Sequence, residues 1–151
     1  MNVFIRNCNK DDCEVLFNWV NDIKVRENSI QNKIIQFEDH VAWFKNMLES
    51  NLCQIYILCL ENNPIGQIRF DFTNENEWTI DFSIATEYRN KGFGKLIVKL
   101  GIDKLKNSSH PIVAIVNINN INSIKIFKSL NFTEISILDI NDEKYIKFLK
   151  E

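Results

Sequence analysis

The spacing of the hydrophobic residues changes along the chain, and it predicts which element each segment forms. In Trp78–Ala85 every second residue is apolar, which is typical of a strand. In Leu96–Leu105 the apolar residues recur about every 3.6 positions, which predicts a helix. Gly92 and Gly94 lie in the turn between these two segments. A helix that starts at such a turn presents unpaired backbone N–H groups and the positive end of its dipole, so the turn is suited to bind a phosphate-like anion. An ordinary turn in which glycine supplies unusual dihedrals is the alternative.

The other segments give a mixed order of strands and helices. Strands are predicted at Val3–Cys8, Gln54–Leu60, Ile65–Phe72, Ile112–Val116, Phe132–Leu138 and Lys144–Leu149, and helices at Asp11–Asn21, Phe37–Ser50 and Asn122–Leu130. Asp11 and Glu14 resemble a capping box for the first helix. The polar segment 22–36 is predicted to be a loop or a short irregular helix. The central helix is predicted to end near Lys106, followed by a break over 107–111. Short turns predict antiparallel hairpins, the last one at Asn141–Asp142, whereas the strand–helix–strand passage makes 112–116 parallel to 78–85.

Composition excludes several functional classes. A chain of 151 residues predicts one domain with its own core. A formal net charge of −2 and a pI near 5.7 argue against non-specific nucleic-acid binding. The longest apolar run, Ile55–Leu60, is too short to span a bilayer, and the N-terminal residues have no signal-peptide pattern. We therefore expect a cytoplasmic protein with neither a membrane nor a nucleic-acid partner.

The four cysteines do not have the spacing of a metal site. Cys8, Cys13, Cys53 and Cys59 form no Cys-x-x-Cys pair, and only two histidines accompany them. No bound metal is predicted, and Cys53 and Cys59, which lie in or beside an apolar strand, are predicted to be free buried thiols.

The turn carries a sequence that resembles a known motif. From Ile84 to Gly94, an apolar strand end leads into Arg-x-x-Gly-x-Gly at a helix start, which resembles motif A of the GCN5-related N-acetyltransferases. In that family the turn amides bind the pyrophosphate of acetyl-coenzyme A. The resemblance implies that this co-substrate is bound by Arg89, Asn90, Lys91, Gly92, Phe93, Gly94 and Lys95. It also implies that the thioester carbonyl is polarised by backbone N–H groups near Phe82, Ser83 and Ile84.

A second stretch resembles the same family. Asn120-x-x-Ser123, followed by Phe127, is similar to the family's segment that contacts coenzyme A, and Asn120 also suits a helix N-cap. The order β-α-α-β-β-β-α-β-α-β-β is that of the family's mixed α/β fold, with a mostly antiparallel sheet of about seven strands and four helices. Phe127 stands where many relatives carry the tyrosine that protonates the departing thiolate. A water, Ser123 or the acceptor amine must then take that role, or the thiolate departs unassisted. Asn131 replaces the usual glycine at the end of this helix, where asparagine tolerates left-handed dihedrals.

One face of the predicted sheet carries a row of polar residues. With the hairpin turn near Glu75, Arg69 is expected to face Asp81, and Asp71 to face Thr79. The row consists of Gln67, Arg69, Asp71, Asp81 and Ser83. Two interpretations remain open: an Arg69–Asp81 ion pair, or a catalytic row in which Asp81 or Asp71 is the general base and Arg69 orients the substrate.

The segment from Arg26 to Trp43 indicates where the acceptor binds. It resembles acetyltransferases that act on amino-sugar nucleotides in the synthesis of pseudaminic-acid-like surface sugars, through Arg26, Asn28, Ser29, His40 and Trp43. Arg26 suits the phosphates of such an acceptor, Trp43 could stack on its base, and His40 titrates in a range that suits a base. Packing beside a helix is the alternative for His40.

The expected function is transfer of an acetyl group from acetyl-coenzyme A to a primary amine by direct attack in a ternary complex. The foremost acceptor is the 4-amino group of a nucleotide-linked amino sugar. Acetylation of a protein N-terminus, a lysine or another small amine is an alternative, and so is a non-catalytic acyl-coenzyme A-binding module. The sheet edges expected at Val3–Cys8 and Lys144–Leu149 leave room for a homodimer.

Overall fold

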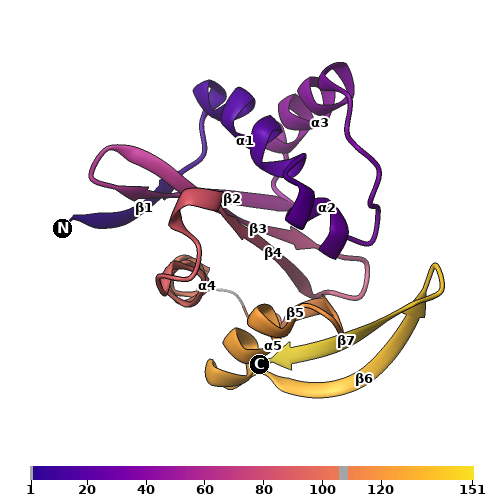
Figure 1. Ribbon diagram of the computed structural model, residues 1–151. Coiled ribbons are helices and arrows are strands. Elements are labelled where there is room, and N and C mark those ends of the chain that lie inside the picture. Colours follow the sequence, from indigo (N-terminus) through magenta and orange to yellow (C-terminus); the bar gives the residue numbers. More distant parts are fainter. Residues whose placement is uncertain (1, 106–108) are drawn as a thin grey trace.

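A mixed β-sheet runs through the whole molecule, and the computed structural model describes residues 2–105 and 109–151 (Figure 1). Its strand order is β1-β2-β3-β4-β5-β7-β6. The strands are β1 (Val3–Asn7), β2 (Cys53–Leu60), β3 (Asn63–Phe72), β4 (Trp78–Ile84), β5 (Ile112–Asn117), β6 (Thr133–Ile140) and β7 (Glu143–Lys150). The helices are α1 (Cys13–Val20), α2 (Ile23–Asn28), α3 (Phe37–Glu49), α4 (Phe93–Lys104) and α5 (Ile121–Ser129). Short 3₁₀ turns lie at Lys10–Asp12 and Thr86–Tyr88.

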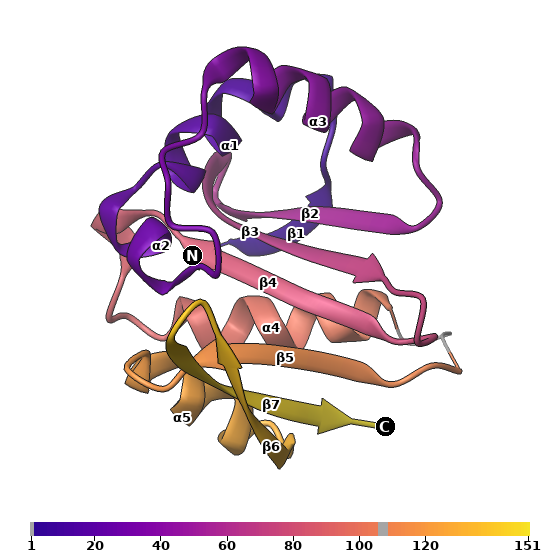
Figure 2. The ribbon, with the colours of Figure 1, turned by 90° about the vertical axis from the view of Figure 1, so that its right-hand side faces the viewer.

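The sheet is interrupted between β4 and β5. These two strands are parallel and pair only at Trp78↔Ile112 and Thr79↔Val113, whereas every other neighbouring pair is antiparallel. Figure 2 shows β4 and β5 diverging from this junction toward the end of the sheet where α2 lies. The predicted mixed, mostly antiparallel sheet with a parallel crossover is confirmed. The divergence could not be predicted from the sequence.

The helices cover the sheet on both faces and create two apolar clusters. α1, α2 and α3 lie on one face, and α4 and α5 on the other (Figures 1 and 2). The α4–α5 side holds the larger cluster, which includes fully buried Ile68, Ile97 and Phe148. Ile57 belongs to the smaller cluster, which packs under α1 and α3. Burial of each large apolar side chain contributes about 1.5–3 kcal/mol to folding.

Several predicted boundaries change at the start of the chain. The capping box is formed by Asn9 and Asp12, not by Asp11 and Glu14. The Asn9 side chain accepts from the Asp11 backbone N–H, and Asp12 accepts from the Asn9 N–H, both at 2.9 Å. The reason is that a 3₁₀ turn precedes α1, so helical backbone begins before the apolar stripe of the helix does. Asp12 is further fixed by a 2.8 Å ion pair with Arg6.

The polar segment 22–36 contains the short helix α2, so the described residues hold five α-helices rather than four. The Asp22 side chain caps α2 by accepting from the Lys24 and Val25 N–H groups. At the C-terminal side, Asn131 has the expected left-handed conformation with φ 68°. Asn141 and Asp142 also have positive φ at the predicted tight turn. α4 is described to Lys104, and the predicted helix end near Lys106 lies outside the described residues.

The second sheet edge differs from the prediction. β7 lies between β5 and β6, so the edge strand is β6 and not the segment Lys144–Leu149. β7 pairs with β5 along one edge and with β6 along the other, so it has an interior position. Within the described residues no helix has the length and apolar character needed to cross a membrane.

Candidate active site

A cleft of about 930 Å³ opens where β4 and β5 diverge. Its walls come from α2, β4, the turn before α4, β5 and the start of α5. The predicted site residues that line it are Asn28, Ser29, Asp81, Phe82, Ser83, Ile84, Arg89, Asn90, Gly92, Gly94, Lys95, Asn120, Ser123 and Phe127. The structure thus brings the end of β4, the glycine turn and the α5 segment together, as the sequence predicts.

The edge of β4 that faces the cleft presents backbone donors. The Trp78 N–H donates toward β5, to the Pro111 carbonyl, whereas the Ala85 N–H donates toward β3, to the Ile65 carbonyl. Because N–H groups alternate between the two edges of a strand, the Phe82 and Ile84 N–H groups point into the gap beside β5. The Ser83 N–H points to β3. Phe82 and Ile84 are therefore the residues whose amides can polarise a thioester carbonyl lying in the cleft.

The glycine turn is shaped to accept an anion. Asn90 and Gly92 have positive φ, 61° and 88°. The hydrogen bond from the Leu96 N–H to the Gly92 carbonyl is the first helical hydrogen bond of α4. The N–H groups at 93–95 precede that bond and point out of the helix start, where the helix dipole also favours negative charge.

The two glycines serve different purposes. A Cβ atom at Gly92 would meet no described atom within 4 Å, so this side of the turn is open. A Cβ atom at Gly94 would lie 2.9 Å from Ile126 Cδ1, because α4 and α5 pack closely there. Lys95 and Lys125 add positive charge to the same end of the cleft. An open turn of amides beside two lysines fits the pyrophosphate of acetyl-coenzyme A.

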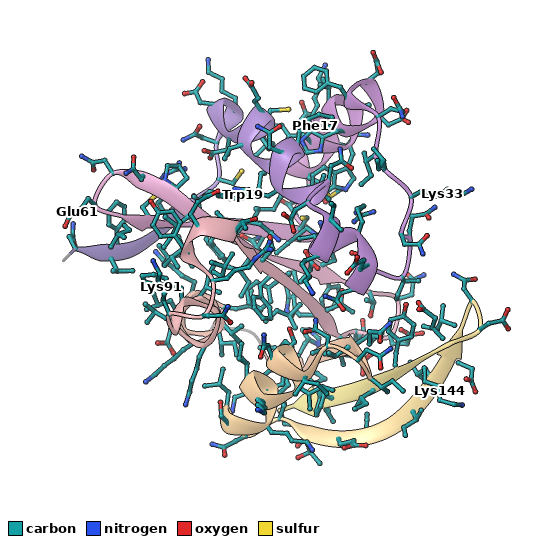
Figure 3. All side chains as sticks on the ribbon, viewed as in Figure 1. Phe17, Trp19, Lys33, Glu61, Lys91 and Lys144 are labelled. Carbon is teal, nitrogen blue, oxygen red and sulfur yellow. The ribbon has the colours of Figure 1, made fainter. Side chains whose placement is uncertain are left out.

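Arg89 does not act as a simple anion ligand. Its Nε donates to the Ile84 carbonyl at 2.8 Å, and its Nη2 forms a 2.9 Å ion pair with Asp22. Lys91, labelled in Figure 3 beside the start of α4, lies with its Nζ 5.9 Å from the centre of the Tyr88 ring. Lys91 and Phe93 stand outside the cleft lining.

The α5 segment has both of its predicted features. The Asn120 side chain caps α5 by accepting from the Ser123 N–H at 3.3 Å, and Asn120 also lines the cleft. The Phe127 ring is 2% exposed and makes edge contacts with Phe82 and Phe132, at 5.8 and 5.0 Å between ring centres. Phe127 is thus mainly a core residue that reaches the cleft at its edge.

Asp81 is the carboxylate that β4 presents to the cleft. The predicted register is confirmed: Arg69 lies opposite Asp81, and Asp71 opposite Thr79. Gln67 Nε2 donates to Asp81 Oδ2 at 3.1 Å and to Ser83 Oγ at 3.2 Å. Gln67 therefore orients the Asp81 carboxylate.

The Arg69–Asp81 ion pair, one of the two interpretations of the polar row, is not formed, and Arg69 pairs with Asp71 instead. Arg69 Nε donates to Asp71 at 2.8 Å, two residues along the same strand and on the same face. The Arg69 guanidinium also lies 5.3 Å from the centre of the Trp43 ring. Burial alone would lower the pKa of Arg69, but the charges of Asp81 and Asp71 raise it overall. Asp71, Arg69 and Trp43 lie behind the cleft wall rather than in it.

Arg26 organises the loop after α2. Its Nη1 donates to the carbonyls of Gln31 and Lys33, at 2.6 and 3.2 Å, and its Nη2 donates to Ser29 Oγ at 3.2 Å. Burial lowers the pKa of Arg26. The cation that α2 presents to the cleft is Lys24.

His40 lies in the packing between α3 and α1. The ring is 3% exposed, its Nε2 lies 2.8 Å from the Cys13 carbonyl, and it contacts Phe17 and Phe44. Figure 3 labels Phe17 where α1 and α3 meet. A carbonyl partner requires that Nε2 carries the hydrogen. His40 is outside the cleft, and the structure gives it a packing role.

This placement predicts a pH-dependent stability. Burial lowers the pKa of His40 below its usual 6.5, so the unfolded chain binds a proton that the folded chain resists. The stabilisation is complete above about pH 6.5 and is lost as the pH falls through the lower folded-state value. We expect urea unfolding between pH 5 and 8 to show this loss, and His40→Gln to remove it. Equal pH dependence in wild type and His40→Gln would contradict the assignment.

The cysteines pack in or beside the core and do not line the cleft. Burial raises the pKa of Cys8 and of Cys53 to about 12, so neither thiol ionises near neutral pH. Cys53 and Cys59 are buried, and all four thiols are free. No group of three or more His, Cys, Asp and Glu residues is arranged to hold a metal within 2–105 and 109–151.

Several cleft residues were not identified from the sequence. Lys24, Glu27, Asn117, Lys125 and Glu143 line the cleft. Asn117 and Glu143 come from β5 and from the β6–β7 hairpin, and no local pattern marks them. Asp22, the N-cap of α2, does not line the cleft, but its capping role could have been predicted, because aspartate is a favoured residue at that position.

A turn suited to bind phosphate, an exposed strand edge and a carboxylate in one cleft are the features expected of a coenzyme A-dependent acyltransferase. Comparison with known proteins agrees. Residues 2–133 match the acetyltransferase (GNAT) domain, so the chain belongs to the GNAT acetyltransferase family. It is therefore an N-acetyltransferase that uses acetyl-coenzyme A as co-substrate.

Individual relatives share the sequence or the fold. Acetyltransferase PseH of Campylobacter jejuni is 24% identical over 95% of this chain and 88% of its own length. Spermidine N-acetyltransferase from Vibrio cholerae, solved with coenzyme A and spermine, superimposes with a TM-score of 0.87 at 16% identity, over 98% of this chain and 94% of its own. Aminoglycoside acetyltransferase AAC(6')-Ib with coenzyme A gives 0.82 at 18% identity, over 99% and 94%. The two structural likenesses show the fold.

Proposed function

We propose that this enzyme acetylates a primary amine of a small molecule, foremost the 4-amino group of a nucleotide-linked amino sugar. The observation that carries the proposal is the cleft itself. The phosphate turn lies at one end, the amides of Phe82 and Ile84 point into the gap, and Asp81 lies on the same strand. Acetyl donor, carbonyl-polarising groups and proton acceptor thus fit one continuous space.

The reaction is a direct attack in a ternary complex. The neutral amine attacks the thioester carbonyl carbon, so a C–N bond forms, and the C–S bond breaks as the thiolate departs. Asp81, oriented by Gln67, accepts the proton that the amine loses, directly or through a water. The N–H groups of Phe82 and Ile84 stabilise the negative charge that develops on the carbonyl oxygen.

Phe127 has no hydroxyl, so it cannot donate a proton to the departing thiolate as a tyrosine at this position would. Ser123 lines the cleft one turn earlier on α5, and we assign to its hydroxyl the relay of a proton from a solvent water to the thiolate, with direct donation by water or by the acceptor amine as the alternatives.

Sequence relationships support the nucleotide-sugar acceptor. The resemblance of 26–43 to amino-sugar nucleotide acetyltransferases and the relative PseH favour it. Arg26 is engaged with the loop after α2, so Lys24, Asn28 and Ser29 are the α2 groups proposed to contact the acceptor. A phosphate on the acceptor would then face Lys24.

A basic acceptor is the second candidate. Glu27, Asp81 and Glu143 line the cleft from three different elements, α2, β4 and β7. These three carboxylates, which lie apart from the lysines proposed to bind the pyrophosphate, favour a small amine with more than one positive charge. Acetylation of a protein N-terminus or of lysine remains a further alternative.

The test is release of free coenzyme A thiol from acetyl-coenzyme A, with a UDP-linked 4-amino sugar, a lysine peptide and spermine compared as acceptors. Turnover with the nucleotide sugar alone would support the proposal, and turnover with spermine alone would support the second candidate. If coenzyme A binds but none of the acceptors causes thiol release, the result would instead favour a non-catalytic binding module. Because burial raises the pKa of Cys8 and of Cys53 to about 12, these two thiols should add little signal at neutral pH.

A further inference from the structure

Two walls of the cleft come from segments far apart in the chain, and one carboxylate joins them. α2 forms one wall, and the turn that holds Arg89 forms the other. Asp22 immediately precedes α2, and its two oxygens reach both walls. The contacts among Asp22, Thr86 and Arg89 are referred to below as the Asp22 bridge.

The bridge uses both oxygens of the carboxylate. Oδ1 accepts from the Lys24 N–H at 3.1 Å and from Arg89 Nη2 at 2.9 Å, and Oδ2 accepts from Thr86 Oγ1 at 3.0 Å. One carboxylate therefore caps α2 and anchors the segment that leads into the glycine turn. The side chains of Asp22 and Arg89 are about three-quarters covered, at 24% and 26% exposure, so solvent screens the pair only partly.

The other end of Arg89 leads into the reaction centre. Its Nε donates to the carbonyl of Ile84, the residue whose N–H points into the gap beside β5. The path from the cap of α2 to the exposed edge of β4 therefore consists of three consecutive contacts. Burial alone would raise the pKa of Asp22, but the bonds from Arg89 and Thr86 lower it, so the carboxylate stays charged at neutral pH.

We propose that Asp22 is a positioning residue that couples acetyl-coenzyme A binding at the glycine turn to the placement of α2, the acceptor wall. When the turn closes on the pyrophosphate, Arg89 is fixed, and through Asp22 the N-terminus of α2 is fixed with it. The coupling is reciprocal, so an ordered α2 also favours binding of the co-substrate. The inference rests on the acetyl-coenzyme A site of the proposed function and not on the identity of the acceptor.

The test measures coenzyme A binding and amide hydrogen exchange in α2, with coenzyme A as the only ligand. In wild type, coenzyme A should slow exchange of the amides at 24–28. Asp22→Asn keeps a good N-cap but loses the charge that pairs with Arg89. We expect the Kd for coenzyme A to rise by about three- to tenfold and the slowing in α2 to disappear. A purely structural role would change basal exchange and Tm without removing the response to coenzyme A.

Two further variants make the result decisive. Asp11→Asn removes an exposed carboxylate before α1, away from the cleft, and should behave as wild type in both measurements. Thr86→Val removes one bond of the bridge and leaves the cap and the ion pair intact, so it tests the coupling even if Asp22→Asn does not fold. It should weaken the α2 response to coenzyme A.

Each contrary outcome has a separate meaning. Asp22→Asn or Thr86→Val proteins in which α2 responds to coenzyme A as in wild type would overturn the inference. A wild-type α2 with no response to bound coenzyme A would overturn it as well. Wild-type protein that bound no coenzyme A would refute the proposed function together with the inference.

Discussion

Replacing Gly92 with valine is expected to raise the Kd for coenzyme A by at least about tenfold while the domain stays folded. The φ of 88° at this position is strained for a residue with a branched Cβ, at a cost of about 1–3 kcal/mol. The added side chain would also occupy the open side of the turn, where the pyrophosphate is expected to bind. A typical domain with 5–15 kcal/mol of stability tolerates that strain. Isothermal titration calorimetry with coenzyme A, and thermal unfolding, measure the two effects.

Asn141→Val is the matched control for Gly92→Val. Asn141 has a φ of 51° at the β6–β7 turn and does not line the cleft, so valine there introduces similar strain without touching the co-substrate site. It should lower Tm and leave the Kd for coenzyme A unchanged. Wild-type affinity in Gly92→Val would show that the co-substrate does not use this turn.

Replacing Asp81 with asparagine is expected to lower kcat by about 10²-fold, because general base catalysis contributes at least that much when the base is well placed. Asparagine keeps the hydrogen-bonding partner of Gln67 but cannot accept the proton of the amine. The KM for acetyl-coenzyme A should change little. Steady-state kinetics with the acceptor identified in the thiol-release assay gives both values.

Asp71→Asn separates the two carboxylates that the sequence could not distinguish. Asp71 pairs with Arg69 behind the cleft wall, so its loss should affect stability more than kcat. A larger fall in kcat for Asp71→Asn than for Asp81→Asn would reverse the assignment. A wild-type kcat in Asp81→Asn would leave Asp81 with a structural role only.

Local patterns predicted the backbone of the site well. The register of β3 and β4 follows from the hairpin turn and from strict alternation, and both predicted pairs, Arg69↔Asp81 and Asp71↔Thr79, are confirmed. The glycine turn and the Asn120 cap also depend on a few consecutive residues, so they could be read from the sequence. The hydrogen-bonding partners of the side chains could not be predicted from the register, because a long side chain such as that of Arg69 can reach several acceptors on one face.

Contacts between segments far apart in the chain could not be predicted from the sequence. Asp22 and Arg89 are 67 positions apart, and only the closure of α2 onto the turn brings them together. Likewise, His40 has the chemistry of a base, but its burial against Phe17 and the Cys13 carbonyl depends on how α3 packs on α1. A residue's type indicates what it can do, whereas tertiary packing determines whether it can reach the substrate.

The narrow junction between β4 and β5 has a consequence for how the domain unfolds. Two residue pairs join strands β1–β4 to strands β5–β7, so the sheet consists of two antiparallel halves with few ladder bonds between them. Local opening follows such weak boundaries, so the β4–β5 ladder is expected to open more readily than the ladders within each half, while the apolar cluster under α4 and α5 still packs the halves together. Acetyl-coenzyme A in the cleft would contact β4 on one side and α5 on the other. The co-substrate would then complete the connection between the halves, and the ligated domain should unfold more nearly as one unit than the free domain does.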